Sequence, residues 1–125
     1  MTPNTFHKPI CLPHAPNGQC VVIDAADFCY AHSTPGHLTT ITYKSVKDGK
    51  EKLFSTSKTK DLGKIDKQVK LLLRFIIRVH KSWMVNRHFI QTYIPGENML
   101  IMKDDTAIPV GRLYKSRLSA AIIII

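Results

Sequence analysis

The sequence offers few side chains whose spacing could support catalysis or metal binding. Asp104 and Asp105 are adjacent, and neighbouring residues of an extended chain point apart, so they suit a solvated turn better than an acid/base pair. Ser82 lies two residues after His80, but no oxyanion element accompanies this pair. The six histidines show no HExxH or other paired ligand spacing. The sequence therefore indicates a protein that is not an enzyme and that has no metal or cofactor.

Residues 74–85 offer side chains for binding instead. We predict one strand here, on which Arg78, His80 and Ser82 occupy alternate positions and share a face, while Lys81 lies on the opposite face. Each face mixes polar and apolar groups, unlike a strand of a plain core. Either the strand ends near His80, or one face meets solvent and a ligand.

Three nearby features leave a structural role open. Trp83 is more often a core residue than a platform for a nucleic-acid base, and Asn86 is more often a turn or capping residue than a base reader. Arg112 follows a predicted strand end, where an arginine can fork onto guanine O6 and N7, and Lys115 suits a phosphate. Alternatively, Arg112, Lys115 and Arg117 could simply form the solvent-exposed face of a helix.

Charge points to a polyanionic partner. The chain of 125 residues carries a formal charge of +9, and its 44% hydrophobic content suits one globular domain. The excess is concentrated in residues 44–82, which hold twelve Lys and Arg against four Asp and Glu. Nucleic acid is the first candidate, an anionic membrane surface is the second, and a merely basic protein is the alternative. The three cysteines form no CxxC pair, and we expect a cytoplasmic protein with neither signal peptide nor membrane span.

Alternation and turn signals outline the elements that must position these side chains. Helical spacing from Leu62 to Leu72 predicts one helix capped by Thr59, and residues 112–121 predict a short second helix. Residues 32–37 and the Asp48-Gly49 pair read as turns. Strands are predicted over residues 9–12, 20–30 with a bend, 38–45, 52–56, 74–85, 91–94, 99–102 and 107–110.

This pattern predicts a mainly β fold of packed antiparallel sheets, an elongated β-sandwich with one or two short helices. We expect a flexible leader over residues 1–7, one domain over residues 8–121 and an apolar tail over residues 122–125.

Three separated segments resemble one family. Residues 75–86 (FIIRVHKSWMVN) are similar to the hallmark of the LytTR family of bacterial transcriptional regulators. Residues 108–115 (IPVGRLYK) resemble its terminal motif, with Gly111 where the family usually has serine, and residues 23–30 (IDAADFCY) resemble an upstream strand. The resemblance covers about residues 8–121.

The resemblance implies sequence-specific binding of double-stranded DNA at promoters, through loops laid into successive major grooves. Base contacts would come from His37, Lys81 and Arg112, and phosphate contacts from Arg78, Arg87, Lys44 and Lys115. Ser82, Asn86 and Tyr114 belong to the same motifs and complete the candidate DNA-binding set. Family members typically bind paired direct repeats as two protomers. A receiver domain or sensor of a two-component system commonly precedes this module.

An RNA-binding or protein-interaction β-module with the same basic field is the alternative. RNA-binding sheets usually display two or three stacking aromatic residues on one face. Here Phe28, Tyr30, Tyr43 and Tyr93 are scattered along the chain, which favours duplex DNA.

Overall fold

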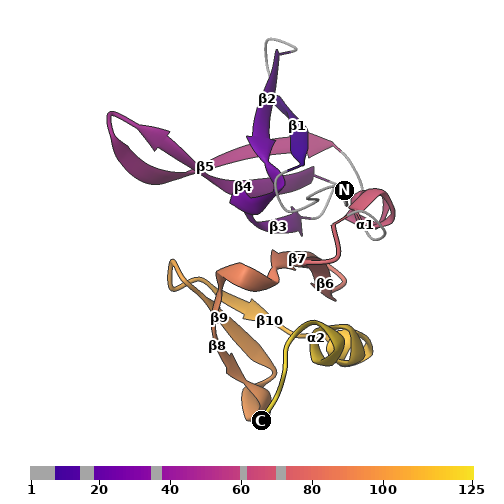
Figure 1. Ribbon diagram of the computed structural model, residues 1–125. Coiled ribbons are helices and arrows are strands. Elements are labelled where there is room, and N and C mark those ends of the chain that lie inside the picture. Colours follow the sequence, from indigo (N-terminus) through magenta and orange to yellow (C-terminus); the bar gives the residue numbers. More distant parts are fainter. Residues whose placement is uncertain (1–7, 15–18, 35–37, 60–61, 70–72) are drawn as a thin grey trace, which may run out of the picture.

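The computed structural model describes residues 8–14, 19–34, 38–59, 62–69 and 73–125, and these residues form three antiparallel sheets with two α-helices (Figure 1). The strands are β1 (Pro9–His14), β2 (Gln19–Asp24), β3 (Phe28–Thr34), β4 (Leu38–Lys47), β5 (Lys50–Thr59), β6 (Ile76–His80), β7 (Trp83–Asn86), β8 (Ile90–Ile94), β9 (Met99–Met102) and β10 (Ala107–Pro109). The helices are α1 (Leu62–Val69) and α2 (Lys115–Ala121), with 3₁₀ turns η2 (Ala25–Asp27), η3 (Arg87–Phe89), η4 (Pro95–Glu97) and η5 (Arg112–Tyr114).

The central sheet has the order β5-β4-β3-β7-β6 and is covered on both faces. Met84 and Val85 are adjacent in β7, point to opposite faces and are both fully buried. Met84 belongs to an apolar cluster with residues of β1, β2 and α1, whereas Val85 belongs to a second cluster with residues of β9, β10 and α2. The layers are therefore the β1–β2 pair, the central sheet, and the sheet of order β10-β9-β8, as Figure 1 shows.

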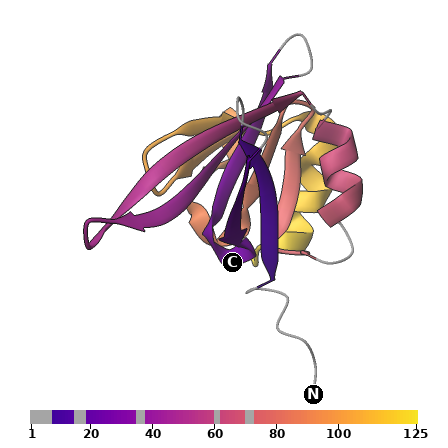
Figure 2. The same cartoon turned by 90° about the horizontal axis from the view of Figure 1, so that it is seen from above.

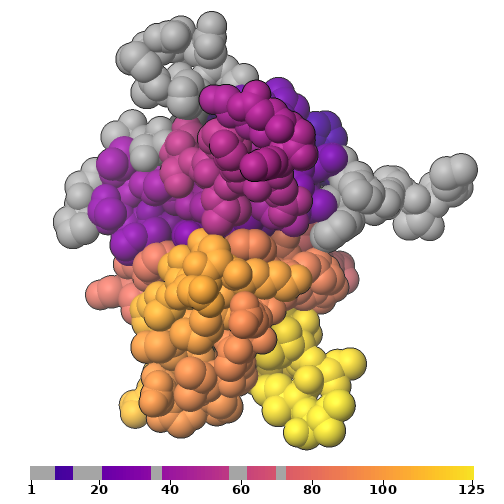
Figure 3. Space-filling view, turned by 90° about the vertical axis from the view of Figure 1, so that its left-hand side faces the viewer, coloured from indigo at the N-terminus to yellow at the C-terminus, as the bar shows by residue number. Residues whose placement is uncertain are grey.

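The β4–β5 hairpin is formed by the two longest strands that the structure describes, each of 10 residues. Asp48 and Gly49 both have positive φ, 55° and 74°, which is the conformation that a two-residue hairpin turn requires. The register pairs Lys47 with Lys50 and continues to Leu38 opposite Thr59. In Figure 2 the hairpin projects away from the side on which α1 and α2 lie. Figure 3 views its magenta tip from the front, above the orange segment that contains β8 and β9.

The predicted fold class is confirmed, with two local corrections. The strand predicted over residues 74–85 is a hairpin of β6 and β7, because the chain reverses at Lys81 and Ser82. Residues 32–34 of the predicted turn belong to β3, so the strand continues up to the residue before the Pro-Gly pair. α1 starts at Leu62 with the predicted helical spacing, and the predicted cap by Thr59 stays a prediction because the side chains and backbone between β5 and α1 lie outside the described residues.

The domain ends remain a prediction. The leader over residues 1–7 lies outside the described residues, as does Leu72. Ile122 packs against the second apolar cluster, whereas Ile123 to Ile125 are exposed. Within the described part of the chain, no helix is long and apolar enough to cross a membrane.

Candidate nucleic-acid interface

The turn between β6 and β7 is held rigidly while its lysine side chain stays exposed. Arg78 Nη2 donates a hydrogen bond to the carbonyl oxygen of Lys81 at 2.7 Å, and the Ser82 N–H donates to Nδ1 of His80 at 3.0 Å. From the adjacent strand, the Ser33 N–H donates to the carbonyl oxygen of Ser82 at 2.9 Å. The backbone that carries Lys81 is therefore fixed, as a side chain that reads a ligand requires.

The loop before α2 lies directly against this hairpin. The Gly111 N–H donates to the carbonyl oxygen of Val79 at 2.8 Å. A Cβ at position 111 would lie 3.5 Å from Cδ2 of His80 and 3.1 Å from Cδ2 of Tyr114, so glycine lets the tyrosine ring pack closely where the family usually has serine. Arg112 follows with an exposed side chain. His80 and Gly111 are in contact, and the next residue after each of them is Lys81 and Arg112, respectively. The two basic residues therefore lie at the same edge of the molecule.

Tyr114 links this loop to the neighbouring arginines. The guanidinium carbon of Arg78 lies 5.5 Å from the centroid of the tyrosine ring, and that of Arg117 lies 5.6 Å from it. Arg117 also pairs with Asp66 of α1, at 2.8 Å between Nη1 and Oδ2. Lys115 starts α2 next to Tyr114 and is exposed. The half-buried Arg78 therefore joins the turn to the tyrosine ring, while the exposed Lys115 remains open to a phosphate.

The end of β3 adds one residue, His32, that the sequence did not single out. His32 stacks on Trp83 with ring centroids 3.9 Å apart and an interplanar angle of 9°. Trp83 is only half-buried and is also 6.1 Å from the Tyr30 ring. Because residues 32–34 were predicted to be a turn, the pairing of His32 with Trp83 of β7 had no sequence signal. His37 lies outside the described residues.

The remaining candidates lie at the other end of the strands. Asn86 ends β7 and is 2% exposed: its Nδ2 donates to the carbonyl oxygen of Phe28 at 2.8 Å, and its Oδ1 accepts from the His88 N–H at 2.9 Å. Arg87 follows it, and Lys44 lines a cavity together with Asn86. Asn86 therefore caps η3 inside the protein, which is the structural role left open above, and no side-chain contact with DNA is available to it.

Burial and neighbouring charges set the protonation of the groups near the turn. Desolvation lowers the pKa of His80, and the positive charges of Lys81, His32 and Arg78 lower it further. A neutral imidazole is the form that can accept the Ser82 N–H at Nδ1. Elsewhere, burial raises the pKa of the Cys29 thiol to about 12, so this cysteine is an unreactive core residue. Among the described residues, no group of three His, Cys, Asp or Glu side chains could hold a metal ion.

Comparison with known proteins bears on both fold and function. Residues 19–123 match the family model described as the LytTr DNA-binding domain. The chain is 36% identical over 101 residues to the sensory transduction protein LytT of Bacillus subtilis (strain 168), which covers 78% of this chain and 37% of that protein. It therefore spans little more than a third of the length of this relative. A solved LytTr DNA-binding domain of a putative methyl-accepting/DNA response regulator from Bacillus cereus matches with a TM-score of 0.65 at 16% identity, over 93% of this chain and 97% of that one, which shows the fold.

Proposed function

The chain belongs to the LytTr DNA-binding domain family, and we propose that it binds specific double-stranded DNA sequences as the DNA-binding part of a bacterial transcriptional regulator. A regulator that acts on chromosomal DNA in a bacterium would work in the cytoplasm, where we expect this protein. The resemblance of residues 75–86 and 108–115 to the family motifs is confirmed by the family match, which includes both segments.

The observation that carries the proposal is the shared edge of Lys81 and Arg112. Both side chains are exposed, and the segments that carry them are joined by the hydrogen bond from the Gly111 N–H to the carbonyl oxygen of Val79 at 2.8 Å. Arginine and lysine at a rigid edge can each donate to O6 and N7 of guanine in a major groove. Lys115, which starts α2 three residues after Arg112 and is exposed, would hold a neighbouring phosphate.

The finer parts of the proposal concern how the domain lies on DNA. We expect the β6–β7 turn and the loop at Gly111 to enter one major groove and the β3–β4 connection, with His37, to approach the next. Two protomers would then occupy direct repeats whose spacing follows the helical repeat of about 10.5 base pairs. A receiver or sensor segment would supply the signal, as the name of the relative LytT suggests for that protein.

Selection of bound duplexes from a random pool tests the proposal. The expected result is an enriched sequence that appears twice, in the same orientation, and binds at least a thousandfold more tightly than random duplex. Fluorescence anisotropy at two salt concentrations then compares this duplex with random duplex, single-stranded DNA and structured RNA. Equal affinity for cognate and random duplex would refute sequence-specific binding, and tighter binding to RNA would favour the RNA-binding alternative.

A further inference from the structure

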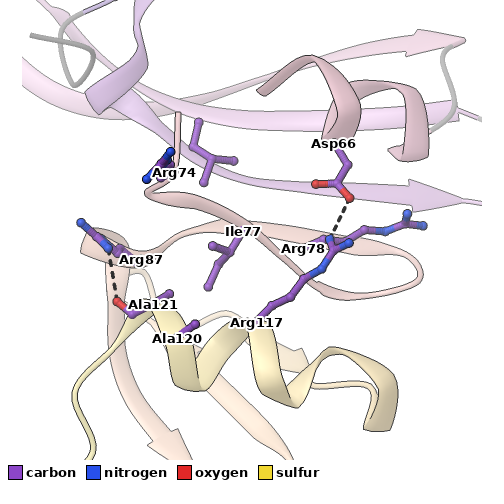
Figure 4. Close-up of a pocket in the computed structure, with 9 residues that line it drawn as sticks. Asp66, Arg74, Ile77, Arg78, Arg87, Arg117, Ala120 and Ala121 are labelled. Carbon is purple, nitrogen blue, oxygen red and sulfur yellow. Dashed lines mark hydrogen bonds and ion pairs between the residues drawn. The ribbon is translucent and has the colours of Figure 1, made fainter. Parts of the chain in front are cut away.

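A cavity of about 460 Å³ lies at the edge strand β6, and residues of β6, α1 and α2 contribute to its lining. Its floor is apolar and consists of Ile76, Ile77, Ala120 and Ala121. In Figure 4, Ile77 lies between Arg87 at one end and Arg117 at the other. This volume falls within the range of about 300–1,000 Å³ that is typical of small-molecule sites.

Four arginines surround this floor, against a single acid. Arg117 pairs with Asp66 at 2.8 Å, and Arg87 Nη1 reaches the carbonyl oxygen of Ala121 only at 3.4 Å. Arg74 is exposed at the rim. Nε of Arg78 is a buried donor that has no hydrogen-bond partner among the described residues. The cavity therefore combines an apolar surface with four guanidinium groups, whose bonds to Asp66, to the carbonyl oxygen of Ala121 and to that of Lys81 leave further N–H donors on each of them.

We propose that this cavity binds a small amphipathic anion, a carboxylate that carries an alkyl or aryl body. The carboxylate would accept hydrogen bonds from guanidinium groups, which bind planar carboxylates in a two-pronged geometry. The hydrocarbon would cover Ile77 and the two alanines of α2 and gain free energy from the burial of apolar surface. An inorganic anion would bind only the arginines, and a neutral hydrocarbon would contact only the apolar floor, so each should bind more weakly than the amphipathic anion.

Titration of the whole chain with octanoate, without DNA, tests this proposal independently of the proposed function. Isothermal titration calorimetry should give a dissociation constant on the order of 1 mM or tighter. Amide signals of Ile77, Ala120 and Ala121 should shift in ¹H–¹⁵N spectra, while those of the β4–β5 hairpin should not. Octan-1-ol and inorganic phosphate, at matched concentrations, should each bind at least tenfold more weakly.

Variants locate the site. Arg87→Gln and Arg74→Gln should each weaken octanoate binding severalfold to about tenfold, and Ala120→Trp should block the cavity from the exposed side of α2. Lys47→Gln, at the far hairpin tip, is the control with the same loss of charge, and thermal unfolding verifies that every variant is folded. Equal binding of octan-1-ol or of phosphate would overturn the proposal, as would an equal loss in Lys47→Gln or unchanged binding in Ala120→Trp.

Discussion

At the scale of single residues, Arg112 carries the proposed reading of a base. For Arg112→Ala we expect a loss of about 1–3 kcal/mol on cognate duplex, with relaxed preference at one base position and a much smaller loss on random duplex. Fluorescence anisotropy on both duplexes measures the difference. Arg74→Ala removes the same charge from an exposed position off the interface and serves as the control. An equal loss on the two duplexes would mean that Arg112 contacts phosphate alone.

Asn86 illustrates how a motif residue can act entirely within the protein. Its side-chain amide is buried and bonds the backbone of Phe28 and His88, so removal of the amide leaves unpaired backbone groups. Asn86→Ala should lower the free energy of unfolding by about 1–3 kcal/mol. Urea denaturation measures this loss, and Gln91→Ala, which truncates an exposed amide on β8, should change stability little. A fully stable Asn86→Ala protein with weakened DNA binding would contradict the structural role.

At the scale of elements, the β6–β7 hairpin depends on a neutral histidine. The folded protein lowers the pKa of His80 below its ordinary value of 6.5, mainly by desolvation and further by Lys81, His32 and Arg78. The unfolded chain therefore takes up the proton first, and the contribution of His80 to stability is present above pH 6.5 and is lost as the pH falls through the folded pKa. Below that pKa, a protonated Nδ1 can no longer accept the Ser82 N–H.

We therefore expect amide hydrogen exchange at Ser82 to accelerate relative to its intrinsic rate as the pH falls from about 7 to about 5, across the ordinary titration range of histidine. NMR titration of His80 should show a pKa below 6.5 at the same time. In a His80→Asn variant the pH dependence of Ser82 exchange should vanish. A Ser82 amide whose protection is unchanged across this range would show that the turn does not rely on the imidazole.

Elements with a single strong pattern could be predicted from the sequence. The Asp48-Gly49 turn, the alternation of β4 and the apolar spacing of α1 have local causes, and all three are present. The β6–β7 reversal could not be predicted in the same way, because the Lys81-Ser82 turn contains neither glycine nor proline. It is stabilised by a side-chain hydrogen bond from Arg78 and a tertiary hydrogen bond from Ser33. The stack of His32 on Trp83 likewise depends on strands far apart in sequence. Motif resemblance identified Lys81 and Arg112 as candidate DNA contacts together with Asn86. Only the tertiary structure shows that the two basic side chains are exposed, whereas Asn86 is buried.

At the scale of the whole molecule, the concentration of charge in residues 44–82 does not make one binding face. Lys81 lies at the β6–β7 turn, which is bonded to Ser33 near the β3 end that pairs with Leu38. Lys47 and Lys50 lie at the other end of β4, which is 10 residues long. At about 3.4 Å per residue, this strand separates the two groups by about 30 Å. Part of the positive charge therefore lies at the tip of the projecting hairpin, far from the proposed DNA edge.

This division makes the salt dependence of DNA binding a test of where the phosphates lie. Each phosphate that a lysine neutralises contributes about −0.9 to the slope of log K against log salt concentration. Lys115→Ala should therefore make the slope shallower by about 0.9, with a similar loss of affinity for cognate and random duplex. Lys50→Ala removes the same charge from the hairpin tip and should leave the slope unchanged. If Lys50→Ala lowers the slope as much as Lys115→Ala, the hairpin also contacts DNA, and the interface is not confined to the edge of Lys81 and Arg112.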